Sequence, residues 1–108
     1  MSNDQKITIL PEDRVKLSKD QRNLITLALE KQLPQEDAEF LEAVQKDKAK
    51  IADPYMKIDN YLVKKYGSVF GKIFLSTIIG GEEGCMETIK VIEESNAQAR
   101  MKRQKKVR

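Results

Sequence analysis

Residues 69–79 read VFGKIFLSTII and hold the longest apolar run of the chain. On a helix, five of these residues share one face at three- and four-residue steps, namely Phe70, Ile73, Phe74, Thr77 and Ile78. The β-branched residues would also suit a strand, but the only other segment with strand-like alternation is the distant KITIL at 6–10. One distant partner is weak support for a sheet, so we predict a helix at the centre of the core.

Signals for two further helices lie earlier in the chain. The stretch SKDQ has the spacing of a capping box, in which Ser18 and Gln21 cap each other, and it predicts a helix that ends near Leu33. A second helix is predicted over 34–53, because acidic residues fill its first turns and lysines fill its last.

The same reasoning divides the remaining chain into three more segments. Asp53 and the proline after it end the second helix and favour a third helix over 54–66. The glycine pair at 80–81 ends the central helix, and a final helix is predicted from about residue 82. Its apolar stripe ends near Ser95, so we expect nothing beyond that point to pack on the core.

These elements predict an all-α fold, a small bundle of four to five helices with an extended N-terminal arm and a basic C-terminal tail. We assign residues 1–16 to a mobile arm, residues 17–97 to the helical domain, and residues 98–108 to a disordered or extended tail. Ten residues are predicted to form the core: Leu24, Phe40, Val44, Ile58, Leu62, Phe70, Ile73, Phe74, Ile89 and Ile92.

The composition excludes several kinds of reaction centre. The chain has no histidine and only one cysteine, Cys85, which removes His-based nucleophile pairs and Cys- or His-rich zinc sites. The glycine-rich GGEEG at 80–84 resembles an anion cradle, but its own glutamates would repel a phosphate. We therefore expect no catalysis, no cofactor and no metal, and we expect Cys85 to be a small buried residue.

Positive charge is concentrated at the C-terminus. Residues 98–108 carry six basic and no acidic side chains, whereas residues 1–97 carry 14 basic and 17 acidic ones, a net charge of −3. The six basic residues are Arg100, Lys102, Arg103, Lys105, Lys106 and Arg108. Such a run binds phosphates largely without regard to base sequence, so we predict contact with DNA or RNA. The alternative is a solvated helix end whose cations complement the helix dipole.

Three tyrosines lie among lysines, a mixture that stacks bases in single-strand binders. At 100° per residue, however, Tyr55, Tyr61 and Tyr66 lie about 120 to 140° apart in succession around a helix axis and form no single platform. We expect them to pack on the core with their hydroxyl groups at its rim.

The helical body has more apolar residues in its later helices than so small a domain can bury. We expect the excess around Tyr55, Phe70 and Ile78 to form a docking or self-association face. The resulting hypothesis is a non-catalytic binding protein that contacts nucleic acid through its tail and a protein partner, or itself as a homo-oligomer, through its body. The alternative is a protein-protein adaptor or inhibitor, of the phage or mobile-element accessory type, with no nucleic-acid role.

The N-terminal sequence lacks the pattern of a secretory signal, and no apolar run approaches the roughly 20 residues that span a bilayer. A lone cysteine fits a reducing compartment. We therefore expect a cytoplasmic protein without a membrane partner or a small-molecule substrate.

Overall fold

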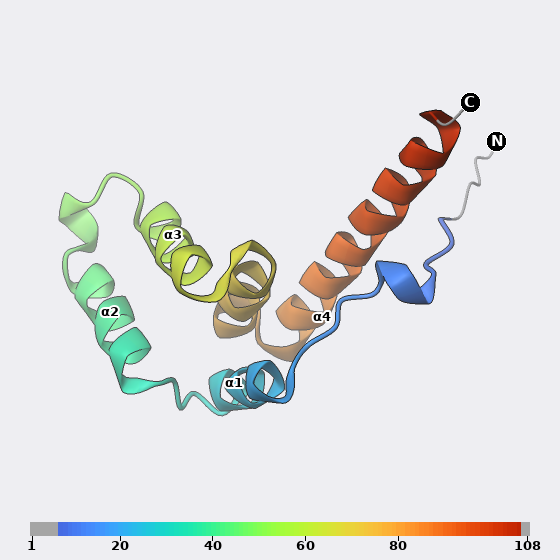
Figure 1. Ribbon diagram of the computed structural model, residues 1–108. Helices are drawn as coiled ribbons and strands as arrows, with labels where there is room; N and C mark the ends of the chain where they lie inside the picture. Colours follow the sequence, from blue (N-terminus) through green and yellow to red (C-terminus); the bar gives the residue numbers. More distant parts are fainter. Residues whose placement is uncertain (1–6, 107–108) are drawn as a thin grey trace.

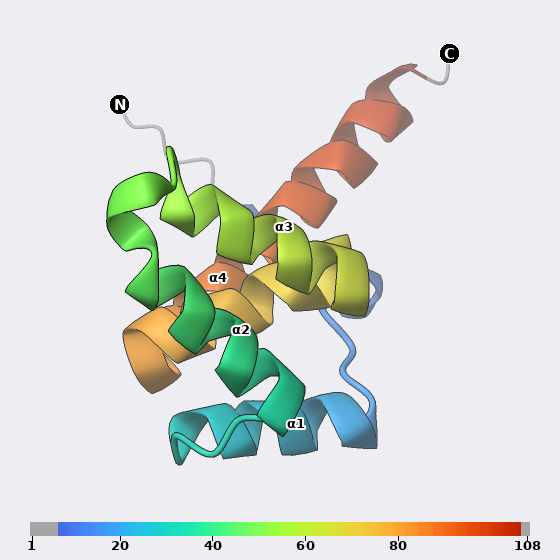
Figure 2. The same cartoon turned by 90° about the vertical axis from the view of Figure 1, so that its left-hand side faces the viewer.

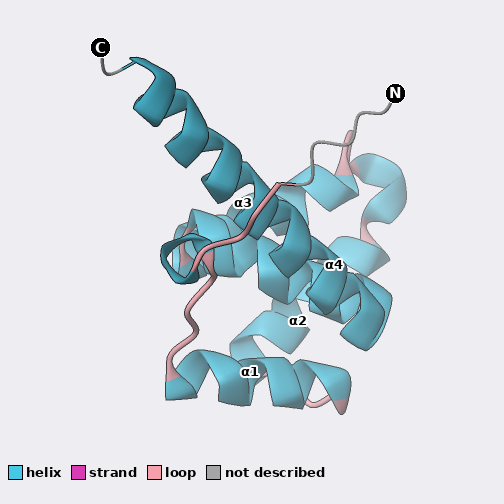
Figure 3. Ribbon diagram, turned by 90° about the vertical axis from the view of Figure 1, so that its right-hand side faces the viewer, coloured by secondary structure: helices cyan, strands magenta, loops and turns pink. Residues whose placement is uncertain are grey.

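The computed structural model describes residues 7–106, which form helices joined by loops (Figure 1). In chain order the elements are a 3₁₀ turn η1 at Pro11–Asp13, α1 at Lys19–Leu29, α2 at Gln35–Lys46, a 3₁₀ turn η2 at Lys48–Lys50, α3 at Pro54–Tyr66 and α4 at Ser68–Lys106. This range contains no strand (Figure 3), which confirms the prediction of an all-α bundle. In Figure 2, α1 lies below and α3 above, with α2 running between them.

Both predicted N-caps are present. The backbone N–H of Gln21 donates to the Ser18 hydroxyl at 3.1 Å, and the Gln21 side chain accepts from the Ser18 N–H at 2.9 Å. At the start of α3, Asp53 accepts from the N–H of Met56 at 3.0 Å, and a proline is the first helical residue. These caps satisfy N–H groups that a helix start leaves without partners.

Two predicted helix ends are wrong. The first helix ends at Leu29 because Lys31 has φ 60°, and the N–H of Gln32 donates to the carbonyl of Leu27 in a Schellman closure. The segment 34–53 is not one helix, since α2 ends at Lys46. All residues from 45 to 50 are exposed, so no packing holds these turns in an α-helix.

Gly81 divides α4 into two limbs, residues 68–80 and residues 82–106, because its φ of 68° and ψ of −153° are not helical. The second limb folds back on the first. The Thr88 hydroxyl donates to the Ser76 hydroxyl at 2.6 Å, and a Cβ added to Gly84 would lie 2.6 Å from the Ser76 carbonyl oxygen. The glycine-rich segment is thus a tight connection between packed helices, and the predicted helix over 69–79 forms the first limb.

The first limb supplies the centre of the core. Phe74 and Ile73 are fully buried, as is Leu62 of α3, and a Cβ added to Gly71 would lie 2.7 Å from the Cα of Val63. Six predicted core residues are buried: Val44, Ile58, Leu62, Phe70, Ile73 and Phe74. The other four are partly buried: Leu24, Phe40, Ile89 and Ile92. Cys85 is buried, as expected.

The described part of the N-terminal arm, residues 7–16, lies along the second limb (Figure 1). The N–H of Val15 donates to the Glu93 carboxylate at 3.0 Å, and the Asn96 amide donates to the carbonyl of Asp13 at 3.0 Å. Ala97 is fully buried. The expectation of an unpacked chain beyond Ser95 is therefore wrong, because α4 continues to Lys106 and residues 96, 97 and 100 are buried or contact the arm.

Of the helices in residues 7–106, none combines the length and the apolar character that a membrane crossing requires.

Candidate protein-docking groove

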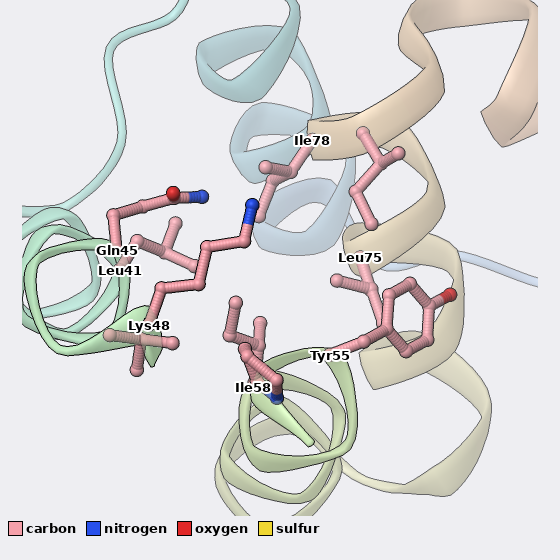
Figure 4. A pocket seen from close by; sticks show the side chains of 10 residues that line it. Leu41, Gln45, Lys48, Tyr55, Ile58, Leu75 and Ile78 are labelled. Atoms are coloured by element: carbon pink, nitrogen blue, oxygen red, sulfur yellow. The ribbon is translucent and has the colours of Figure 1, made fainter. Parts of the chain in front are cut away.

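A groove of about 310 Å³ opens between α2, α3 and the first limb of α4 (Figure 4). Its lining consists of Leu41, Val44, Gln45, Lys48, Pro54, Tyr55, Ile58, Leu75, Ile78 and Ile79. Most of these side chains are apolar, and the polar ones lie at the rim. This composition is typical of a surface that receives apolar groups from another molecule.

Helical spacing explains why these residues meet. In α2 and η2 the lining positions are 41, 44, 45 and 48, each of which lies three or four residues from another member of the set, so one stripe faces the groove. Ile58 and Leu75 are buried at the base, whereas Tyr55 and Ile79 are 58% and 60% exposed at the edge. The groove therefore has a buried apolar base and an apolar edge that is open to solvent.

Lys48 lies across the mouth of the groove. In Figure 4 its side chain reaches from the α2 side toward Ile78, and Gln45 points the same way. Lys48 is exposed and forms no ion pair with another residue of the described range. A free ammonium group thus lies above an apolar base.

A second, shallower hollow of about 230 Å³ adjoins the groove. Tyr55 and Ile79 line both depressions and form the ridge between them. Glu87 and Thr88 of the second limb line the far side. The apolar lining therefore ends at this ridge, and beyond it the hollow is lined by polar residues and glycines, namely Ser76, Gly80, Gly84, Glu87 and Thr88.

The opposite end of the α2–α3 pair is held closed by a buried carboxylate. Asp37 has no exposed surface and accepts hydrogen bonds from Tyr61 at 2.8 Å, from Lys65 at 2.7 Å and from Tyr66. Next to it the rings of Phe40 and Tyr61 stack with centroids 4.0 Å apart. We call Asp37, Tyr61, Lys65 and Tyr66 the Asp37 cluster. The cluster therefore joins α2 to α3 at the end of the pair that lies away from the groove.

The Asp37 cluster shifts the pKa of its members. Burial alone would raise the pKa of Asp37, but the hydrogen bonds from one lysine and two tyrosines outweigh it, and this pKa lies below the ordinary 3.8. Burial and the hydrogen bond to Asp37 raise the pKa of Tyr66 to about 12. Burial lowers the pKa of Lys65, yet its bonds to two carboxylates prevail and raise that pKa. The cluster therefore favours an ionised Asp37, a cationic Lys65 and neutral tyrosines.

Two of the three predicted partner-binding residues meet in the groove, and the third does not. Tyr55 and Ile78 line it. Phe70 is only 3% exposed, with its ring centroid 5.7 Å from that of Tyr66 and 5.5 Å from that of Phe74. Its prediction as an exposed docking residue is wrong, because the start of α4 turns this ring into the core.

The structure separates Arg100 from the other predicted nucleic-acid-binding residues. Its guanidinium group pairs with the Asp13 carboxylate at 3.0 Å and donates to the carbonyl of Thr8 at 3.1 Å. The hydrogen bond from Arg100 lowers the pKa of Asp13, and that same bond raises the pKa of Arg100. Arg100 thus holds the arm.

Of the other five predicted residues, Lys102 and Arg103 are exposed on α4. The side chains of Lys105 and Lys106, and all of Arg108, lie outside the described part of the structure. The C-terminal end of α4 points away from the other helices, as Figure 1 shows.

Sequence reasoning missed Asp37 and Lys48. Both fitted the general charge pattern of a helix, with acids first and lysines last, so nothing set them apart. The partners of Asp37 lie 24 to 29 residues further along the chain.

Within residues 7–106 there is no cluster of three or more His, Cys, Asp or Glu residues able to hold a metal ion.

No family model, no curated protein and no solved structure matches this chain.

Proposed function

We propose that this chain is a non-catalytic binding protein that docks a protein partner, or a second copy of itself, in the groove between α2, α3 and α4. The observation that carries this proposal is an apolar groove whose edge residues, Tyr55 and Ile79, are more than half exposed. Large apolar side chains grouped around a concave surface are typical of interaction sites. The Asp37 cluster joins α2 to α3, and the buried Ile58 and Leu75 form the base of the groove, which favours binding because buried residues need less ordering.

A recovery experiment with two exposed valine or isoleucine positions tests this proposal. Ile79→Glu places a charge at the groove edge, whereas Val69→Glu places the same charge on the same limb outside the groove, at a residue that is 48% exposed. We expect the wild-type chain and Val69→Glu to retain one partner after nuclease treatment and Ile79→Glu to lose it. Light scattering on the same three proteins distinguishes a second copy from a different protein. Equal recovery by all three would contradict the proposal.

A second candidate function is contact with nucleic acid through the end of α4. It is supported by the exposed cations Lys102 and Arg103, which have no ion pair within the described range. Removal of one phosphate-binding cation reduces the slope of log affinity against log salt by about 1. Replacing both residues by Gln should therefore weaken retention on DNA or RNA at low salt and lower that slope by about 2. Unchanged retention would leave the groove as the only proposed site.

We further propose a cytoplasmic location for this activity. The support is chemical, since the one cysteine can form no intramolecular disulfide and suits a reducing compartment. Fractionation of cells that express the full chain tests it, and recovery from an oxidising compartment would contradict it.

A further inference from the structure

We infer that the groove selects an amphipathic helix of a partner protein that carries an acidic side chain next to its apolar anchor. This inference rests on the proposed docking function and specifies the chemistry of the partner. The groove is walled by helices, and residues 7–106 offer no sheet edge to which an extended peptide could add a strand. An apolar groove walled by helices suits the apolar face of a partner helix, which is one of the common modes of recognition.

The acidic requirement follows from Lys48. A purely apolar partner would cover this free ammonium group and remove its hydrating water without supplying a hydrogen-bond acceptor. The cost of this desolvation opposes binding. A carboxylate on the partner would instead pair with it. Residues 46–50 strengthen the preference, because they carry three exposed lysines and one acidic residue, Asp47, a net charge of +2.

The second hollow also favours one orientation of the partner helix along the groove. Beyond the ridge formed by Tyr55 and Ile79, the rim residue is the exposed Glu87 instead of a lysine. A partner helix that spans both depressions would place an acidic side chain near Lys48 and a basic one near Glu87. Because the two rims carry opposite charge, only one orientation of the helix pairs both of them.

The test uses three synthetic peptides of about 16 residues, a length that gives roughly four helical turns. They share the same leucine stripe and differ only in the residues beside the first anchor, which are Glu, Gln or Lys. Fluorescence anisotropy measures the affinity of each peptide for the full chain. We expect the Glu peptide to bind about three- to fivefold more tightly than the Gln peptide, in the range of a partly exposed ion pair, and the difference to shrink at high salt.

Charge-reversal variants assign this difference to the groove. Lys48→Glu should reverse the order, so that the Lys peptide binds most tightly. Lys19→Glu is the matched control, because Lys19 is exposed at the start of α1, outside the groove lining, and the net charge changes equally. This control should keep the preference for the Glu peptide. A preference that both variants abolish would reflect overall charge and would overturn the inference.

The remaining outcomes separate this inference from the proposed function. Equal binding of all three peptides, abolished in Ile79→Glu, would overturn the acidic preference and leave docking in the groove intact. No binding of any peptide at about 1 mM, the limit of weak but specific association, would overturn the inference, while the recovery experiment still decides the proposed function. Binding of decanoate in place of the peptides would overturn the inference in favour of a small amphiphile. A dimer that Ile79→Glu abolishes would overturn it in favour of a second copy of the chain.

Discussion

Asp37 is the residue on which the geometry of the groove depends. Its carboxylate is fully buried, yet three side chains of α3 donate hydrogen bonds to it, so its charge is compensated. Removing one side chain from such a buried group lowers the free energy of unfolding by more than the whole hydrogen bond contributes to it. The reason is that the remaining polar atoms stay buried without a hydrogen-bond partner.

Acid should destabilise this protein through Asp37. The pKa of Asp37 is lower in the folded chain than the ordinary 3.8, so the ionised carboxylate favours folding at neutral pH. That contribution is present above 3.8 and is lost as the pH falls below it, through the folded-state pKa. Urea unfolding from pH 6 to pH 2 should therefore show a falling free energy. Asp37→Asn should be less stable at neutral pH and show a shallower acid slope; a slope equal to the wild type would contradict the role of Asp37.

Alkaline pH should destabilise this protein through Tyr66. Its pKa rises from 10.0 to about 12 on folding, so the folded chain retains the phenolic proton that the unfolded chain loses in this interval. Stability should therefore decrease as the pH rises from 10.0 to about 12. Tyr66→Phe should show a weaker alkaline decrease and cost about 1 to 3 kcal/mol at neutral pH, since Asp37 loses a donor.

Tyr55→Phe is the control for this measurement. Tyr55 is 58% exposed, so the loss of its hydroxyl should change the unfolding free energy by less than about 0.5 kcal/mol. Equal losses of unfolding free energy in Tyr66→Phe and Tyr55→Phe would show that the hydrogen bond from Tyr66 to Asp37 contributes nothing to stability.

At the scale of elements, the bend of α4 brings two helical limbs into direct backbone contact. Gly84 permits this contact, because a Cβ at that position would lie 2.6 Å from the Ser76 carbonyl oxygen. The limbs would have to separate to admit a methyl group, and backbone atoms do so less readily than a flexible side chain. Gly84→Ala should therefore destabilise the fold by about 1 to 3 kcal/mol in urea unfolding.

Gly80→Ala is the matched variant at the same bend. A Cβ at Gly80 meets nothing within 4 Å. Alanine should be tolerated there and should stabilise the first limb by about 0.5 to 1 kcal/mol, through its higher helix propensity. A loss of stability in Gly80→Ala as large as in Gly84→Ala would contradict the close approach of the limbs.

Local sequence signals predicted the elements better than their ends. The Ser18 and Asp53 caps and the break at 80–81 depend on neighbouring residues, so they could be identified from the sequence. The end of α1 could not, because its closure places Lys31 in a conformation that glycine usually adopts. The end of α2 depends on where packing stops, and that information lies in other helices.

At the scale of the whole molecule, the N-terminal arm and the end of α4 form one unit. Asp13 and Arg100, 87 positions apart in the chain, join them. Arg100→Ala should release the arm while leaving the first limb buried. Hydrogen exchange should then accelerate at the amide of Val15, which donates to Glu93, and stay unchanged at Phe74. Equal exchange at Val15 in both proteins would show that the pair does not hold the arm.

Long-range pairing also limited what the sequence could predict about the candidate site. The sequence predicts Tyr55 and Ile78 as docking residues because the apolar residues exceed the capacity of a small core, and both residues line the groove. Phe70 was misassigned, and Arg100 was grouped with free cations, because helical spacing does not reveal which face another element covers. Lys48 lies over an apolar groove, and the sequence alone does not reveal this position.

The most direct test of the docking groove is site-specific photocrosslinking. A benzoylphenylalanine in place of Tyr55 or Ile79 reports on the groove, and one in place of Val69 reports on an exposed apolar site outside it. If the groove docks a protein, the first two positions should crosslink the same protein after nuclease treatment, or a second copy of the chain, and position 69 should not. Crosslinking of the retained partner from position 69 alone would contradict docking in the groove.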